Sequence, residues 1–435
     1  MNELRPFHLI VLFIFGISAI VGIFIFANFS GGGGAKKDAV GAVVIWGTLP
    51  KAPFESALAE LSGAEERFSD VTYVEKSAVT FSTELSGALA EGAGPDLILL
   101  SQEMLNAEQA KLYVIPYASL PQRTFLDSYV SLFELFLTNE GTYGVPLLVD
   151  PLVLYYNRTI LSAESIVAPP STWEAVSGFA TEVTQRDPGG TIVRSAIALG
   201  EYGNVRNARA ILSLLLLQAG SDITAPTEIG MRSVFADDDP GSFGTTPAQS
   251  AINYYTQFAD PAKNVYSWNR SLPESRESFL AGDSALYLGF ASERVYIASA
   301  NPNLDFDMTS VPIPGTSRAR VNYGVGYAFA LPKTAANGAG ALEVAFALGG
   351  QTSAGSIANA LGAAPAYKYL LSAPPEDPYK PIYYPAALSA KGWISPVPTE
   401  TDRIFLAMIV SITTGRASVD EALRAAAGSL DAALR

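Results

Sequence analysis

The sequence predicts an α/β protein of more than one domain, with parallel sheets covered by helices. Apolar strands and amphipathic helices alternate from residue 42 onward, a pattern typical of parallel sheets with right-handed crossovers. Residues 96–100 (DLILL) form a continuous apolar run, as expected of a strand that is covered on both faces. The chain has 435 residues, which is enough for two to three domains of ordinary size.

The first globular segment carries polar residues where its strands end. In a parallel sheet, ligands bind beyond the carboxyl ends of the strands. Residues 46–48 and Ser101-Gln102 occupy such ends, although loop residues without a ligand are an equally good interpretation. We expect strands at 42–46, 71–75 and 96–100, and helices at 54–66 and 82–91.

Two apolar runs, at 145–149 and 152–156, meet at Asp150-Pro151. Pro151 cannot donate a ladder hydrogen bond and biases Asp150 towards an extended backbone, so we expect the strand to bend or break here. Asp150 is then either a surface acid that opens a turn or an acid at a hinge that faces a ligand.

A second body follows this junction. Ser171 and Glu174 have the spacing of a capping box at a helix start, and residues 221–247 have the composition of an exposed loop. A polar and aromatic stretch after the loop contains Trp268. We expect helices at 207–219 and 248–258, a strand at 192–199, and a helix end, turn and strand within 277–288.

The last third of the chain contains a glycine-flanked stretch at 322–326 (NYGVG). Two glycines there permit a sharp connection or a close approach to a ligand. The proline-rich run 374–385 interrupts the helices, and Ser418 with Glu421 predicts another capping box. We expect a strand at 327–331 and helices at 339–349, 353–361, 401–414 and 418–434.

Composition excludes several classes of function. The net charge is −14 and no basic run is longer than two residues, so nucleic acid is not an expected partner. Without cysteine and with His8 as the single histidine, disulfides, thiol nucleophiles, a soluble imidazole base and zinc clusters are excluded. Catalysis by a pair of carboxylates needs two acids across a cleft, and only Asp150 is a candidate there. We therefore expect no enzyme, cofactor or metal site.

The N-terminus has the length and composition of a membrane span. Residues 7–26 are uncharged and almost wholly apolar, and as a helix they would extend roughly 30 Å, the thickness of the hydrocarbon layer. A cleaved signal peptide is the alternative, but the run is longer than a signal sequence needs and no small-x-small site follows it. We expect residues 1–29 to form an uncleaved anchor, in the membrane through 7–27, and residues 30–39 to form a glycine-rich linker.

Eight segments spread over nearly the whole soluble chain carry a resemblance to a known family. They are AVVIW (42–46), GPDLILLSQ (94–102), YGVPLLVDPLVLYYNRTIL (143–161), PPSTWEAV (169–176), FLAGDSALYLGF (279–290), NYGVGYAFALPK (322–333), LGAAPAYK (361–368) and GRASVDEALRAA (415–426). Each segment is a weak signal alone, but in this order and together they resemble the extracellular solute-binding proteins of ABC importers, in particular the sugar-binding group similar to maltose-binding protein (family 1).

The resemblance implies the type II fold of periplasmic binding proteins, with two α/β lobes, a hinge and a ligand cleft between the lobes. Lobe 1 would comprise 40–150 with 321–372, and lobe 2 would comprise 151–320 with 373–435. The chain would cross between lobes near 149–152, near 320–323 and in the 370s. The resemblance also implies a monomer that lies outside the cytoplasm, captures a sugar or oligosaccharide by hinge closure and delivers it to ABC permease subunits.

The family's cleft residues, carried over by position, are polar and aromatic, as a sugar requires. Gly324 in the glycine-flanked stretch and Trp268 complete the predicted ligand-binding set. Phe290 stands where the family often has Trp, and Thr48 and Ser101-Gln102 stand where it has charged contacts. These differences leave the type of sugar undetermined by the sequence. The carried-over residues are Trp46, Thr48, Lys51, Ser101, Gln102, Asp150, Phe290, Ser292, Tyr323 and Trp393.

Two other functions would use the same fold. The pairs Tyr155-Tyr156, Tyr254-Tyr255 and Tyr383-Tyr384 raise the possibility of ferric iron or another small solute, because phenolates bind Fe(III). One residue of each pair is equally well explained as core, because adjacent strand residues point to opposite faces. The other function is a membrane-tethered ligand sensor without transport.

Overall fold

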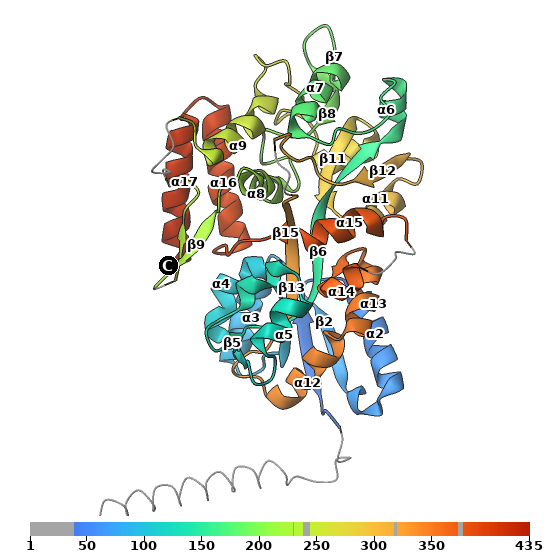
Figure 1. Cartoon of the computed structure of the whole chain (residues 1–435), viewed down its shortest axis with the longest axis vertical. Coiled ribbons are helices and arrows are strands. Elements are labelled where there is room, and N and C mark those ends of the chain that lie inside the picture. Colours follow the sequence, from blue (N-terminus) through green and yellow to red (C-terminus); the bar gives the residue numbers. More distant parts are fainter. Residues whose placement is uncertain (1–38, 229, 238–243, 317–319, 373–376) are drawn as a thin grey trace, which may run out of the picture.

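Two lobes, joined by long strands, make up the computed structural model, which describes residues 39–435 except 229, 238–243, 317–319 and 373–376 (Figure 1). The predicted anchor (1–29) and all of the predicted linker except residue 39 lie outside the described residues. Within the described ranges, no helix combines the length and the apolar character needed to cross a bilayer.

The first lobe is built on three parallel strands with helices on both sides. β1 pairs in parallel with β2 and β3, which confirms the parallel arrangement. β13 then joins the sheet antiparallel to β3, and β6 pairs antiparallel with β13. β3 is buried along its whole length, as its apolar run predicts. The elements are β1 (Val43–Gly47), α2 (Lys51–Ala64), β2 (Val71–Glu75), α3 (Phe81–Ala90), β3 (Leu97–Ser101), α4 (Leu105–Glu108), β4 (Ile115–Pro116), α5 (Gln122–Ser128), β5 (Gly141–Thr142), α12 (Gly338–Leu348), α13 (Gln351–Leu361), β14 (Ala364–Pro365) and α14 (Lys368–Leu371).

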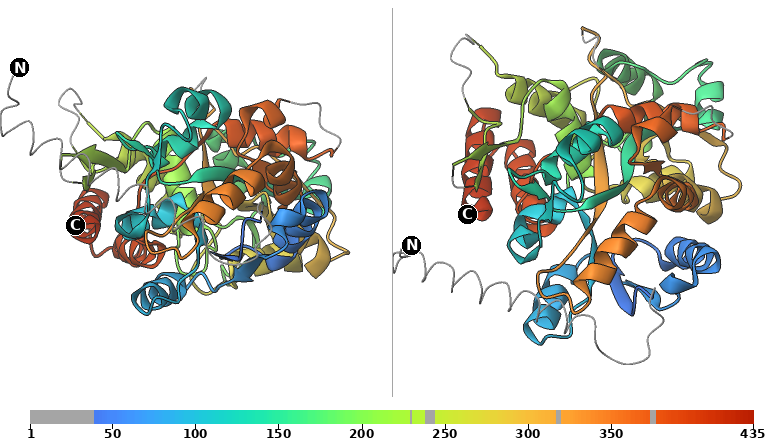
Figure 2. Two further views of the ribbon diagram at one scale, coloured as in Figure 1. Left: turned by 90° about the horizontal axis from the view of Figure 1, so that it is seen from below. Right: turned by 60° about the horizontal axis from the view of Figure 1, so that its bottom comes forward.

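The second lobe surrounds the leucine-rich helix α8. Nearly every residue of α8 is buried, because α9 and α16 pack against it and it also contacts β13. The C-terminal helices α16 and α17 therefore lie beside α8 and α9 (Figures 1 and 2). The elements are α6 (Arg158–Ala163), α7 (Trp173–Val183), β7 (Gln185–Arg186), β8 (Ile192–Ile197), α8 (Ala208–Gln218), β9 (Thr224–Thr227), β10 (Gly230–Ser233), α9 (Pro247–Thr256), α10 (Ser275–Ala281), β11 (Ser284–Phe290), α11 (Glu293–Ala300), β12 (Phe306–Thr309), α16 (Pro398–Thr413) and α17 (Val419–Leu434).

Four elements lie between the lobes: β6 (Val145–Asn157), β13 (Asn322–Ala330), α15 (Lys380–Leu388) and β15 (Ala390–Lys391). β6 and β13 run through both lobes, and β15 pairs in parallel with the start of β13. The exact residue boundaries predicted for the lobes stay a prediction.

The strand was predicted to bend or break at Asp150-Pro151, and a break is wrong, because β6 is one continuous strand of 13 residues. Its neighbours change beside the proline: β13 and β14 pair with β6 up to Pro151 and Val149, and β11 and β12 pair with it from Leu152 onward. Pro151 has no N–H to donate to a ladder hydrogen bond. It is tolerated here because the partner strands of β6 change at this point and no single partner continues the ladder.

The predicted tight connection at 322–326 is also wrong, because these residues belong to β13. Their glycines allow a close approach of protein rather than a turn. A Cβ on Gly326 would lie 2.3 Å from Leu132 Cδ2, and one on Gly324 would lie 3.0 Å from Val149 Cγ1. A side chain at either position would push β13 away from its neighbours.

The predicted exposed loop at 221–247 contains a β-hairpin, β9–β10, that packs against α17. The proline-rich run 374–385 extends into α15, because Pro381 stands in the first turn, where no helical N–H donor is required. Pro385 lies within the same helix. Sequence patterns missed both elements because their stability comes from packing partners that are distant in sequence.

The two predicted capping boxes have different outcomes. Ser418 Oγ accepts from the N–H of Glu421, and the Glu421 carboxylate accepts from the N–H of Ser418, so this box is confirmed. At α7 the predicted box is wrong: Thr172 caps the helix by accepting from the N–H of Ala175, and Glu174 accepts from the N–H of Gly315.

Replacing Gly326 with Ala tests the close packing of β13. The added methyl group overlaps Leu132 and Phe133, so we expect G326A to lower the free energy of unfolding by about 1–3 kcal/mol, measured by urea denaturation. The control is G178A in α7, where nothing lies within 4 Å of the new Cβ, and a gain of up to about 1 kcal/mol is expected. Equal effects of the two substitutions would contradict this account.

Candidate functional site

The floor of the candidate site is one face of the β6–β13 pair. Val325 is paired with Asp150, and Tyr327 with Leu148, so these four side chains lie on the same face of the sheet. Tyr323, two residues before Val325, lies on that face as well. This face carries an acid at the point where β6 passes from the first lobe to the second.

A pocket of about 330 Å³ opens on this floor, and both lobes supply its walls. The floor contributes Leu148, Asp150 and Tyr327. The first lobe contributes the loop after β1 and the end of α13, and the second lobe contributes the start of α11. The wall residues are Leu49, Pro50, Pro53, Ala360, Leu361, Ala363, Ser292, Val295 and Tyr296. The pocket is therefore an interlobe cleft at the carboxyl ends of β1 and β11.

Asp150 is linked across the cleft to the start of α11. Its Oδ1 accepts from the backbone N–H of Ser292 at 3.1 Å, and its Oδ2 accepts from Ser292 Oγ at 2.6 Å. Burial raises the pKa of Asp150 to about 7, against the opposing effect of the two Ser292 hydrogen bonds, and the nearby Glu293 raises it further. This carboxyl group can therefore both donate and accept hydrogen bonds near neutral pH.

Two tyrosines provide ring surfaces in the same pocket. Tyr296 is 44% exposed, and the guanidinium carbon of Arg276 lies 4.1 Å from its ring centroid. Tyr327 lies on the floor, where burial first, and then the negative charges of Glu103 and Asp150, raise its pKa. The phenol of Tyr327 thus remains neutral at physiological pH, and both rings can cover an apolar ligand face.

A cluster of charged groups joins the lobes beyond Tyr327. Arg209 on α8 donates to Glu103, which follows β3, at 3.0 Å, and to Asp402 on α16 at 2.9 Å. Tyr323 on the floor donates to the other oxygen of Glu103. Burial lowers the pKa of Arg209, but the two carboxylates raise it more strongly, so the guanidinium stays charged. An ion pair between Glu103 and Arg209 thus connects the first lobe to the second.

Some of the predicted ligand-binding residues lie at or beside this cleft. Asp150 and Ser292 line it. Thr48 precedes the wall residue Leu49, and Phe290 ends β11 two residues before Ser292. Lys51 begins α2, but its ammonium group pairs with Glu55 at 2.7 Å.

The predicted residues at the ends of β1 and β3 contact protein groups. The ammonium group of Lys76 lies 3.9 Å above the ring of Trp46. The fully buried amide of Gln102 donates to the carbonyl of Gly324 at 3.1 Å and accepts from the N–H of Gly326 at 2.7 Å. Ser101 is buried at the end of β3. Gln102 thus ties β3 to β13 in this structure.

Two predicted tryptophans lie in the core of the second lobe. Trp268 is fully buried and its indole N–H donates to Asn204 at 3.1 Å. Trp393 donates to Ser213 at 2.9 Å and stacks on Phe405. The structure does not bring either ring to the interlobe pocket.

The tyrosine pairs each place one residue in the core. Tyr155 and Tyr255 are fully buried and donate to backbone carbonyls, and Tyr383 is almost fully buried. Burial raises the pKa of all three phenols, which disfavours the phenolate that Fe(III) would need.

Sequence reasoning missed Glu103, Arg209, Tyr296, Tyr327 and Asp402. A signal existed for Arg209, because it is the only charged residue in α8, which is otherwise almost wholly apolar. A charge in such a helix predicts a buried partner. Tyr296 gave no such signal, because α11 itself was not predicted.

The sequence profile of the family described as "Bacterial extracellular solute-binding protein" matches residues 51–348. No curated protein matches the sequence.

Three solved structures illustrate the likeness in fold. The cyclic alpha-maltosyl-1,6-maltose binding protein of Arthrobacter globiformis is 17% identical, with 90% of this chain and 98% of that chain covered and a TM-score of 0.72. A cyclo/maltodextrin-binding protein in complex with maltotetraose is 14% identical, with coverages of 92% and 99% and a TM-score of 0.71. An ABC transporter solute-binding protein of Thermotoga lettingae bound with alpha-D-tagatose is 17% identical, with coverages of 91% and 100% and a TM-score of 0.67.

The raised pKa of Asp150 predicts a pH-dependent stability. Between its ordinary value of 3.8 and about 7, the native carboxyl holds a proton that the unfolded chain has lost, so stability falls as pH rises through this range. Asp150→Asn cannot titrate. We expect the unfolding free energy of the wild type, relative to D150N, to fall by more than about 1 kcal/mol from pH 4.5 to 8 in urea denaturation. A difference that is constant with pH would contradict the assignment.

The interlobe ion pair predicts a large effect at Arg209. Arg209→Met leaves two carboxylates without their cation, so we expect a loss of about 3 kcal/mol in unfolding free energy and a larger radius of gyration by small-angle X-ray scattering. The double variant E103Q/R209M removes one of these charges and is expected to recover part of the loss. As a control, R123M breaks the exposed pair with Asp127 and is expected to lose less than about 1 kcal/mol. An R209M as mild as R123M would argue against the interlobe link.

Proposed function

The chain belongs to the family of bacterial extracellular solute-binding proteins, and we propose that it captures a sugar or short oligosaccharide between its two lobes for an ABC importer. The observation that carries this proposal is the interlobe pocket, in which Asp150 and Ser292 stand beside Tyr296 and Tyr327. One of the similar structures is a cyclic alpha-maltosyl-1,6-maltose binding protein, and two others hold maltotetraose and alpha-D-tagatose, which supports a carbohydrate.

The chemistry of the pocket suits a neutral ligand with many hydroxyl groups. Asp150 and Ser292 offer hydrogen-bond partners to sugar hydroxyls, and the ring of Tyr296 can cover the apolar C–H face of a sugar. A sugar that left these polar groups unpaired would lose about 1–3 kcal/mol for each, which is a source of selectivity. The volume of about 330 Å³ is near the lower end of ligand pockets, so a mono- or disaccharide is the best match.

Closure of the lobes over the ligand follows from the position of the pocket. A sugar bound there contacts Asp150 on the floor, the loop after β1 and the start of α11 at once, so it binds the closed arrangement more tightly than an open one. β6 and β13 would take up the change in backbone angles as the hinge. The closed, ligand-bound form is then the signal that permease subunits recognise.

The location we propose is the outer side of the cell membrane. Residues 1–29 would anchor the chain, through the apolar run at 7–27, and residues 30–39 would tether a monomeric body just off the membrane. The anchor would replace the lipid that is attached to an N-terminal cysteine in related proteins, since this chain has no cysteine.

Sugar binding by variants of the pocket tests this proposal. We expect the wild type to bind at least one member of a panel that includes glucose, D-tagatose, maltose and maltotetraose, measured by calorimetry. Asp150→Ala should weaken that binding about tenfold or more while the protein stays folded, because it removes the acid that would pair with ligand hydroxyls. Tyr296→Ala should weaken it several-fold through the lost ring contact.

Matched controls separate the pocket from general surface effects. Asp127 is largely exposed on α5 and Tyr369 is 73% exposed on α14, so D127A and Y369A remove the same side chains outside the pocket and should bind as the wild type does. No binding by the wild type across the panel would refute a sugar ligand. Normal binding by D150A and Y296A would instead place the sugar elsewhere.

A further inference from the structure

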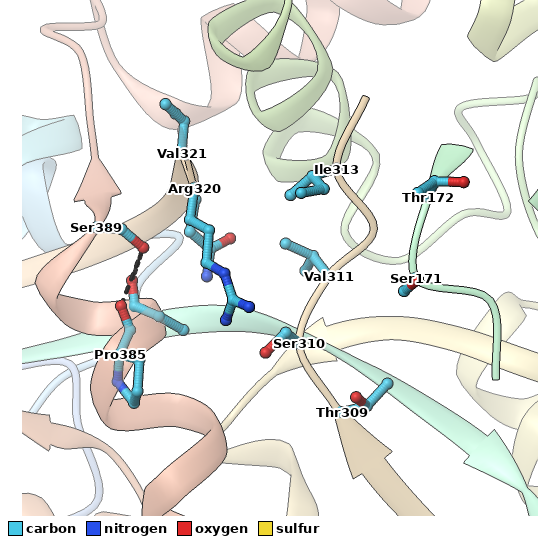
Figure 3. Close-up of a pocket in the computed structure, with 12 residues that line it drawn as sticks. Ser171, Thr172, Thr309, Ser310, Val311, Ile313, Arg320, Val321, Pro385 and Ser389 are labelled. Carbon is cyan, nitrogen blue, oxygen red and sulfur yellow. Dashed lines mark hydrogen bonds between the residues drawn. The ribbon is translucent and has the colours of Figure 1, made fainter. Parts of the chain in front are cut away.

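A second pocket, of about 320 Å³, lies where the segments that join the lobes meet the second lobe (Figure 3). Its walls come from the residues before α7, the segment 309–313 after β12, the residues 320–322 that lead into β13, and the end of α15. Three of these four segments are far apart in the sequence, so the pocket exists only in the folded protein.

This pocket is separate from the interlobe cleft. Asn322 lines it, and Asn322 points to the face of β13 opposite to Tyr323, Val325 and Tyr327, because side chains alternate along a strand. The side-chain amide of Asn322 donates to the carbonyl of Leu152 on β6 at 2.8 Å. The pocket therefore lies on the rear face of the hinge, and the cleft with Asp150 lies on the front face.

Arg320 supplies a positive charge to the rear pocket. Its guanidinium group projects into the cavity (Figure 3), and it makes no hydrogen bond or ion pair with any residue that the structure describes. The hydroxyl group of Ser310 projects into the same space and likewise bonds to no described residue. In a chain with 42 acidic and 28 basic residues, a guanidinium in a pocket without a carboxylate partner is available for an external anion.

The remaining lining sets the size and character of a ligand. Hydroxyls of Ser171 and Thr309 add hydrogen-bond donors at the edge, and Val311, Ile313 and Pro385 add apolar surface beside the guanidinium. A guanidinium with adjacent hydroxyls matches the geometry of a carboxylate or phosphate group, and the apolar surface matches a short hydrocarbon body.

We propose that the rear pocket binds a small organic anion, whose carboxylate or phosphate group pairs with Arg320 and Ser310. Such an anion contacts the joining segment 320–322, α15 and the second lobe together.

The test uses the full chain and simple probes. Butyrate and methyl phosphate represent the two anionic groups, and butyramide is the neutral analogue. Each is titrated at constant ionic strength by calorimetry or ligand-observed NMR, without sugar. We expect at least one anion to bind the wild type, and Arg320→Gln to weaken it about tenfold or more. Ser310→Ala should weaken it by a smaller factor, and Arg123→Gln, which removes an exposed charge on α5, should change nothing.

The outcomes decide the proposal independently of sugar binding. Loss of binding in R320Q and S310A, with R123Q unchanged, supports it, and the preferred anion identifies the head group. It is overturned if neither anion binds, if R320Q binds as the wild type does, or if butyramide binds as tightly as butyrate. Equal weakening in R320Q and R123Q overturns it as well, because the effect is then one of net charge.

Discussion

The antiparallel pairing of β6 with β13 is the contact on which both lobes and the cleft depend. Both strands pass from one lobe to the other, and each gains different partners in each lobe. The fully buried amide of Gln102 supports β13 where it leaves β3, since it bonds the carbonyl of Gly324 and the N–H of Gly326. These bonds satisfy buried backbone groups where the two lobes join.

The two faces of this pair differ in charge. On the front face, Glu103 pairs with Arg209, and burial raises the pKa of Asp150 to about 7, so that this carboxyl group is partly protonated near neutral pH. A neutral polyhydroxy ligand can bond such groups without bringing a further charge into a dry cleft. On the rear face, Arg320 has no acid beside it among the described residues, which suits an anion. One strand pair thus separates the two pockets for which we propose a sugar and an anion.

The ion pair between Glu103 and Arg209 joins the two lobes. Tyr323, on the floor of the cleft, donates a hydrogen bond to the same carboxylate. Breaking such a pair is expensive when one charge is left behind. The pair therefore holds the two lobes together in this structure.

Local sequence patterns by themselves determined the α/β class, the parallel strands of the first lobe, the buried helix α8 and the cap at Ser418, because these depend on neighbours within a few residues. The sequence also predicted Asp150 and Ser292 as site residues. Asp150 was predicted from its position between two apolar runs, and both residues from the resemblance to a family. Only the tertiary structure decided that β6 stays unbroken at Pro151, that Trp268 and Trp393 belong to a core, and that Arg209 meets Glu103. The physical reason is that ladder partners, burial and ion pairs are set by residues more than a hundred positions away, which no local pattern contains.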